Sequence, residues 1–392
     1  MSEATRSGTL RTTLTASGAL TTAMLPTFLL GALSDQVRRD LGIDETAIGA
    51  AVTVLFVSVG LAAAPASRIT ERLGSALALR TGVVISGLAT AAIGAFASAW
   101  WQLALPLAAV GIAVGLIDTG AARAFADGVA SDRQGSAFGL KEASVPGASL
   151  LAGIALPTVG VMLGWRATFV AALAVAALVL VLLPRGGPAA APPDRTTATG
   201  PPPPPTRIRR FAVGVGLGAG SVTAAATFLA PAITDRGLST TAAGATLAVA
   251  SLASIAARIA VGRWADRDDA PTVRAVTAML LCGAAGAGIL ATAAPAPVAV
   301  LAAVALLGGG WGWTGLAFLS VVRSHPGAPA VAAGIVLTGL GIGGALGPPA
   351  FGALASRLSY PAAWSATALA LLAASAVTAS ARPRTSPAPT AR

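Results

Sequence analysis

Three ionisable side chains lie inside long apolar stretches of the chain. Asp118 precedes the end of one stretch at Phe125 by seven residues, and Lys141 and Glu142 lie in the next stretch. A charge inside a membrane span costs several kcal/mol unless it is paired, so such residues are functional candidates. Either carboxylate would be protonated when buried alone and ionised when Lys141 approaches. We predict that Asp118 or Glu142 carries a proton; the alternative is a static Asp118–Lys141 ion pair.

The spacing of these residues limits how they share a site. Lys141 and Glu142 are consecutive, so on a helix they point about 100° apart, which predicts that only one of them faces Asp118 or a cavity. Lys141 is the sole lysine, and a flexible ammonium can lose its proton when buried, which suits proton coupling or anion binding. Arg258, in a later stretch, has the chemistry to bind an anion. The favoured interpretation is that it extends to the membrane surface.

The elements that carry these residues are predicted to be membrane-spanning helices. The chain has 392 residues, of which 55% are hydrophobic and 10% charged, with a mean hydropathy of +0.78; soluble domains carry about 25% charged residues. Roughly 20 apolar residues cross a bilayer as a helix. Twelve such stretches run approximately over residues 10–33, 47–65, 77–97, 103–125, 137–156, 167–183, 211–233, 242–261, 272–293, 297–322, 331–354 and 361–379. The sequence therefore predicts an all-α membrane protein of 12 transmembrane helices.

The positive charge of the chain is unevenly placed along these spans. The net charge is +11, and with a cytoplasmic N-terminus only five basic residues fall outside, namely Arg38, Arg39, Arg166, Arg236 and Arg357. The excess then follows the positive-inside rule. We expect a multi-pass protein of the cytoplasmic membrane with both termini in the cytoplasm. No basic stripe is interleaved with aromatics, so no nucleic-acid partner is expected.

An internal repeat divides the chain into two halves. A shift of 195 residues carries Glu71 onto Asp266 and Gly139 onto Gly334, and it pairs Asp44 with Ser239, each of which is placed to cap the helix that follows. The predicted organisation is a six-helix half over 1–183, a cytoplasmic proline-rich linker over 184–210, a second six-helix half over 211–381 and a disordered tail over 382–392.

The repeat also predicts the lining of a central cavity. At the shift of 195, Asp118 corresponds to Trp313, so both are expected to face the cavity. Together with Trp311, Phe28 and Phe228, Trp313 would form an apolar, aromatic lining for a small molecule. The alternative is that these aromatics only pack between helices or anchor the interface.

Two loops carry similar motifs at the repeat spacing. One reads Gly262-Arg263-Trp-Ala-Asp266-Arg267 and the other Ser67-Arg-Ile-Thr-Glu71-Arg72-Leu-Gly74. They resemble the signature of the major facilitator superfamily, although Ser67 replaces a glycine and Glu71 an aspartate. The resemblance implies two pseudo-symmetric six-helix bundles and a gate at the inner faces. Glu71, Arg72 and Arg123 would act in one half, and Arg263, Asp266 and Arg267 in the other. The alternative role is to hold the loops inside by charge alone.

A glycine pattern in the eleventh predicted span resembles the antiporter motif of drug exporters in the same superfamily. It comprises Gly334, Gly343, Gly347, Pro348 and Gly352. In those exporters the motif lies in the fifth helix, and this copy lies in its repeat mate. Glycines in such a pattern let neighbouring helices approach closely, and the proline produces a kink.

These observations favour secondary active transport of a small organic solute by alternating access. The first hypothesis is proton-coupled export of an amphiphilic compound, and the alternative is proton-coupled uptake of an organic anion through Lys141 and Arg258. A transport-inactive membrane sensor is a third interpretation. An ATP-driven pump is disfavoured because the sole lysine follows Leu140, outside any phosphate-binding motif. We expect no enzyme activity, no metal and no cofactor beyond an ion gradient. The expected partners of a monomer are the solute and the bilayer.

Overall fold

Helices form along every predicted span, since in lipid each backbone N–H needs a partner within its own segment. The computed structural model describes residues 3–183, 205–234, 236–267 and 270–381. Within these ranges, eleven helical segments are long and apolar enough to cross a membrane. The remaining predicted span is α6 (Gln134–Ala155), whose mean hydropathy is lowered by Lys141 and Glu142. With α6 included, each predicted span corresponds to a helical segment.

The elements divide into two groups in chain order. The first half contains α1 (Glu3–Ala32), α2 (Ser34–Leu41), α3 (Glu45–Leu73), α4 (Ser75–Phe96), α5 (Trp101–Gly128), η1 (Ser131–Arg133), α6, η2 (Leu156–Gly160), α7 (Val161–Ala171) and α8 (Leu173–Leu182). The second half contains α9 (Pro205–Thr234), α10 (Thr240–Trp264), α11 (Thr272–Leu290), α12 (Ala296–Val304), η4 (Ala305–Gly309), α13 (Thr314–Ser324), α14 (Pro329–Arg357) and α15 (Tyr360–Ser380).

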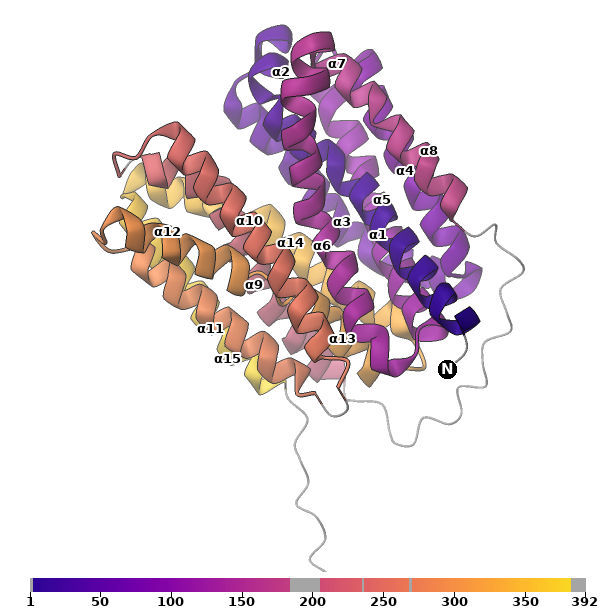
Figure 1. The fold of residues 1–392 in the computed structure, drawn as a ribbon. Helices are drawn as coiled ribbons and strands as arrows, with labels where there is room; N and C mark the ends of the chain where they lie inside the picture. Colours follow the sequence, from indigo (N-terminus) through magenta and orange to yellow (C-terminus); the bar gives the residue numbers. More distant parts are fainter. Residues whose placement is uncertain (1–2, 184–204, 235, 268–269, 382–392) are drawn as a thin grey trace, which may run out of the picture.

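The two halves form separate bundles that meet at one end (Figure 1). We call this the linker end, because α8 ends and α9 begins there. The ribbons diverge toward the opposite end, which carries α2 and α7. We call that the α2 end. Between the halves, α6 packs against α10, and α3 packs against α14. These four helices therefore form a large part of the boundary between the halves.

Two boundaries differ from the sequence prediction. Helix α2 lies between the first two predicted spans, where the sequence predicted no helix. Val37 is buried, and Gly42, at φ 63°, ends the helix in a left-handed conformation. Helix α9 begins at Pro205, so residues 205–210 belong to a helix and not to the linker. Ile208 and Phe211, three residues apart, are both buried on one face. The rest of the predicted linker and the predicted tail lie outside the described residues.

The predicted helix caps are confirmed in both halves. Asp44 accepts a hydrogen bond from the backbone N–H of Ala47 at 2.8 Å, and Ser239 accepts one from Ala242 at 3.2 Å. Each cap starts the second span of its half by satisfying a backbone donor that has no partner within the helix. The repeat read from the sequence is therefore also a repeat of local structure.

Glycines let α14 approach its neighbours closely. A Cβ added to Gly343 would overlap the carbonyl oxygen of Gly216, and one added to Gly347 would overlap that of Gly220. Gly334 lies against Ser67 of α3, with 2.8 Å between its added Cβ and that of Ser67, and Gly352 lies against the ring of Phe228. Pro348 lies inside α14. The glycine pattern thus serves contacts of α14 within its own half and across to the first half.

Replacing Gly343 by alanine is expected to destabilise the protein by about 1 to 3 kcal/mol, since the new methyl group overpacks the α9–α14 contact. The matched control is Gly288→Ala in α11, where an added Cβ meets nothing within 4 Å. Thermal unfolding of the purified protein in detergent compares the two. Equal Tm values for both variants would show that the α9–α14 contact relaxes without strain.

Candidate functional site

A buried ionic cluster lies on α5 and α6. Lys141 is 0% exposed, Asp118 5% and Glu142 6%. The Lys141 Nζ lies 2.5 Å from Oδ1 of Asp118 and 2.7 Å from Oε1 of Glu142. The spacing predicted that only one of Lys141 and Glu142 faces Asp118, and Lys141 is the residue that does. The contact between Lys141 and Glu142 was not predicted; the four-carbon stem of lysine lets its ammonium reach the carboxylate of the next residue. Both carboxylates therefore bind the same ammonium.

The cluster also touches the second half. The Lys141 Nζ lies 4.4 Å from the ring centroid of Phe318 on α13, a distance at which the ring face attracts a cation. The Phe318 ring stacks in turn on Phe138 of α6, with 6.4 Å between ring centroids. Lys141 thus links α5, α6 and α13 where the halves meet, so a relative movement of the halves changes its surroundings.

Arg258 is buried beside this boundary. The prediction that it extends to the membrane surface is therefore wrong. Its side chain is 2% exposed. Its Nε donates to Oγ1 of Thr314 at 3.4 Å, Nη1 donates to the hydroxyl of Ser254, and Cζ lies 5.3 Å from the ring centroid of Trp311. These hydroxyl and aromatic neighbours replace water around the guanidinium, which removes the need to reach the interface.

The predicted aromatic lining is only partly where the sequence placed it. Trp313 is 0% exposed and lies 3.0 Å from a Cβ added to Gly218, so it packs inside the second half and faces no cavity. Trp311 is the tryptophan that faces Arg258. Phe228 stacks on Phe351 of α14 at 4.8 Å, and Phe28 is partly buried against the core of the first half.

The last turn of α3 contacts the second half at the linker end. The backbone N–H of Ala330, in the first turn of α14, donates to Oε1 of Glu71 at 2.9 Å. Arg123 lies 3.5 Å from the same carboxylate and donates to the carbonyl oxygens of Glu71 at 2.6 Å and Thr70 at 2.8 Å. A carboxylate at a helix N-terminus is favoured by unpaired N–H groups and the helix dipole. Glu71 therefore holds α14 against the first half.

The loop after α10 makes the equivalent contact in the opposite direction. The backbone N–H of Ser136, in the first turn of α6, donates to Oδ1 of Asp266 at 3.1 Å, and the Ser136 hydroxyl also donates to this carboxylate. Gly262 lies against Gly135, whose carbonyl oxygen is 2.6 Å from a Cβ added at Gly262. We call the Glu71–Ala330 and Asp266–Ser136 contacts the two latches; both join the halves.

The arginine that serves the second latch was missed from the sequence. Arg323 donates to the carbonyl oxygens of Ala265 at 3.1 Å and Ser131 at 2.6 Å. The carbonyl groups that accept from the two arginines, those of Thr70 and Ala265, are 195 residues apart. The two arginines, Arg123 and Arg323, are 200 residues apart (323 − 123). A second shift of 200 would have found Arg323, and the same shift pairs Asp118 with Phe318. The interrupted helix at η4 changes the register within this span.

The other residues of the two loop motifs have simpler positions. Arg72, Arg263 and Arg267 are exposed, so it is Arg123 and Arg323 that bind the loop backbones. Gly74 ends α3 at φ 93°, a conformation that glycine adopts without steric cost. The contacts at this end therefore depend on one acidic residue and one arginine in each half.

Replacing Glu71 by glutamine is expected to open the linker end more often, because the charge-assisted hydrogen bond to α14 is lost. A cysteine at Ser67, which is 3% exposed and contacts Gly334 of α14, reports the opening in a Cys282→Ser background. Its labelling by a water-soluble maleimide should accelerate on the order of tenfold. Asp35→Asn, at the α2 end, is the control. Unchanged labelling in Glu71→Gln would remove this latch from gating.

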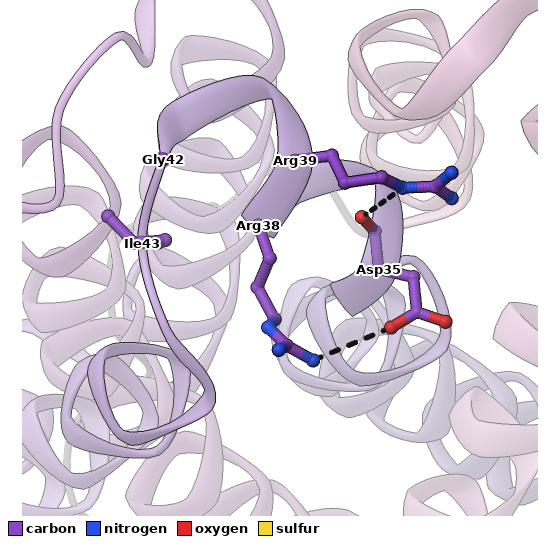
Figure 2. Close-up of a pocket in the computed structure, with 5 residues that line it drawn as sticks. All are labelled: Asp35, Arg38, Arg39, Gly42 and Ile43. Carbon is purple, nitrogen blue, oxygen red and sulfur yellow. Dashed lines mark hydrogen bonds and ion pairs between the residues drawn. The ribbon is translucent and has the colours of Figure 1, made fainter.

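Two surface pockets lie at opposite ends of the molecule. One, of 590 Å³, is lined by Asp35, Arg38, Arg39, Gly42 and Ile43 around α2; Figure 2 shows Arg38 paired with Asp35 at 3.6 Å. The other, of 510 Å³, lies beside Asp266 at the linker end, between α1 and α6. Neither is lined by the buried ionic cluster or by Arg258.

Comparisons with known proteins agree on the fold. A family model described as Major Facilitator Superfamily matches residues 15–336. The chain is 29% identical over 343 residues to the chloramphenicol resistance protein of Streptomyces lividans, covering 82% of this chain and 83% of that protein.

Solved structures extend the likeness to nearly the whole chain. The proton:xylose symporter XylE has a TM-score of 0.77 at 13% identity, covering 96% of each chain. The human organic anion transporter MFSD10 has a TM-score of 0.74 at 16% identity, covering 94% of this chain and 99% of that one. At these identities the structural likeness shows a shared fold.

Proposed function

Because the chain belongs to the major facilitator superfamily, with the two-bundle fold that its loop motifs predicted, we propose that it is a secondary active transporter. It moves a small organic solute across the cytoplasmic membrane by alternating access, as proton-coupled export of an amphiphilic compound. The halves rock about a site near the midplane, as expected for transporters built from repeats.

The observation that carries the proposal is the buried contact of Lys141 with two carboxylates. With all three groups ionised, Asp118, Glu142 and Lys141 carry a net charge of −1, so one bound proton makes the cluster neutral. A low-dielectric surrounding makes the difference in energy between the charged and the neutral cluster large. Since Phe318 of the opposite half lies on the ammonium, rocking of the halves would change the balance between the two charge states. That linkage is what coupling to a proton gradient requires.

The two latches support alternating access. Both join the halves at the linker end, while the ribbons diverge at the α2 end (Figure 1). With the orientation expected from the positive-inside rule, this conformation is closed toward the cytoplasm. Breaking the latches would give the opposite conformation, in which solute enters from the cytoplasm.

Export of an amphiphile draws support from a relative. The Streptomyces lividans protein that shares 29% identity is a chloramphenicol resistance protein, and removal of a toxic compound from the cell is one route to resistance. Chloramphenicol joins an aromatic ring to polar groups, so it belongs to the class of amphiphilic compounds proposed here.

A second candidate, proton-coupled uptake of an organic anion, is favoured by one observation. Arg258 is 2% exposed, and among the described residues its guanidinium contacts two hydroxyls and an aromatic ring, a setting that suits an incoming anion.

The test is transport in proteoliposomes with an imposed pH gradient, across a panel of chloramphenicol, lipophilic cations and organic anions. The proposal predicts that an amphiphile moves opposite to the proton gradient and that a protonophore abolishes the movement. Movement of an organic anion together with protons would favour the second candidate. If no panel compound responds to the gradient, proton-coupled transport of this solute class is refuted.

A further inference from the structure

Arg258 is a buried cation that has no carboxylate in contact with it. A fully buried arginine is almost always paired, yet none of the ion pairs within 4.0 Å found among the described residues involves Arg258. Asp118 and Glu142 bind Lys141 instead. At contact distance the guanidinium therefore has neutral neighbours, and the Glu142 carboxylate acts on it from beyond contact distance.

The neighbours of Arg258 leave part of its hydrogen-bonding capacity unused. A guanidinium presents five N–H donors in a planar fork. The hydrogen bonds of Arg258 among the described residues go to two hydroxyls, those of Thr314 and Ser254. A planar group with two oxygens matches such a fork in a bidentate manner. Carboxylate and nitro groups both have that shape.

An aromatic surface adjoins the fork. The Trp311 ring centroid lies 5.3 Å from the guanidinium carbon, and the residue is only partly buried. We infer that Arg258, Thr314 and Trp311 form a binding site for an aromatic compound carrying a planar two-oxygen group, a carboxylate or a nitro group. The two oxygens bind the Arg258 fork, and the ring packs on Trp311. The inference rests on the proposed transport function and names its substrate class.

The site is covered by α6 in this conformation. A Cβ added to Gly139 would lie 2.5 Å from the carbonyl oxygen of Arg258, and one added to Gly315 would lie 3.1 Å from the backbone of Phe138. Helix α6 therefore packs directly on α10 and α13 beside the site. Asp266 holds the first turn of α6 in that place. Release of this latch uncovers Arg258 from the linker end, the side from which an exporter loads.

The test is ligand-dependent thermal stabilisation of the full-length protein in detergent, with 1-naphthoate, 1-nitronaphthalene and 1-naphthylmethanol as probes that share one ring system. A compound that binds the folded state raises Tm in proportion to its affinity. Wild-type protein should bind the first or second probe at least about tenfold more tightly than the alcohol. Arg258→Gln should remove that difference, and Arg258→Lys should keep part of it. Arg274→Gln, an exposed arginine of α11, should leave it intact.

Each outcome bears on the inference. Stabilisation by naphthoate alone identifies an anion site, and equal stabilisation by the nitro compound identifies a site for an uncharged two-oxygen group. All measurements are repeated with Asp266→Asn, so that a closed gate cannot hide the site. The inference is overturned if neither naphthoate nor the nitro compound raises Tm more than the alcohol does, both in the wild-type protein and in Asp266→Asn. It is also overturned if Arg258→Gln binds these two probes as tightly as the wild-type protein does. Binding without gradient-driven transport would instead refute only the proposed function.

Discussion

Replacing Asp118 by asparagine should abolish gradient-driven transport while leaving exchange of solute across the membrane in place. Asp118 lies on α5 and its partner Lys141 on α6, two helices of the first half, so a shift of α6 against α5 within that half can separate the two. Glu142 is the chain neighbour of Lys141 and moves with it. Asp118 is therefore the carboxylate whose pairing can change during the transport cycle, which is the condition for releasing and binding a proton.

The expected loss is on the order of 100-fold or more in the initial rate driven by a pH gradient, the scale on which one proton-transferring group acts. Exchange requires no net proton movement and should continue at a comparable rate. Asp35→Asn, at the exposed α2 end, controls for the removal of a carboxylate. Full retention of gradient-driven transport in Asp118→Asn would exclude Asp118 from coupling, and a selective loss in Glu142→Gln would assign the proton to Glu142.

Replacing Lys141 by methionine is expected to destabilise the fold strongly, by about 3 to 5 kcal/mol, the cost of leaving a buried charge without its partner. Lys141 is fully buried and lies between two carboxylates. Without the ammonium, Asp118 and Glu142 would confront each other in a surrounding with little water. Thermal unfolding in detergent measures the effect as a lower Tm.

A triple variant separates charge from packing. Lys141→Met combined with Asp118→Asn and Glu142→Gln has no charge left in the cluster, so it should recover most of the stability lost in the single variant. It should also lack gradient-driven transport. If the triple variant is as unstable as Lys141→Met, the loss comes from the shape of the lysine side chain and not from uncompensated charge.

The latches show where sequence reasoning about the site succeeded and where it stopped. Glu71 and Asp266 were identified because their loops repeat at a shift of 195, and the structure places both carboxylates on helix N-termini of the opposite half. Arg323 was missed because the register of its span differs by five residues from that of the loop motifs, which repeat at a shift of 195. A single shift cannot follow a helix that is interrupted, as this one is at η4.

The amino-acid sequence alone determined the helical spans, their division into two halves, the caps at Asp44 and Ser239 and the residues of the ionic cluster. Those features depend on local hydropathy and on spacing along one chain, which the order of residues contains directly. The tertiary structure decided which side chains meet. Lys141 binds both carboxylates, Trp311 and not Trp313 faces Arg258, and Arg258 stays buried. These outcomes depend on the direction of flexible side chains and on helices distant in sequence, and only their packing settles that.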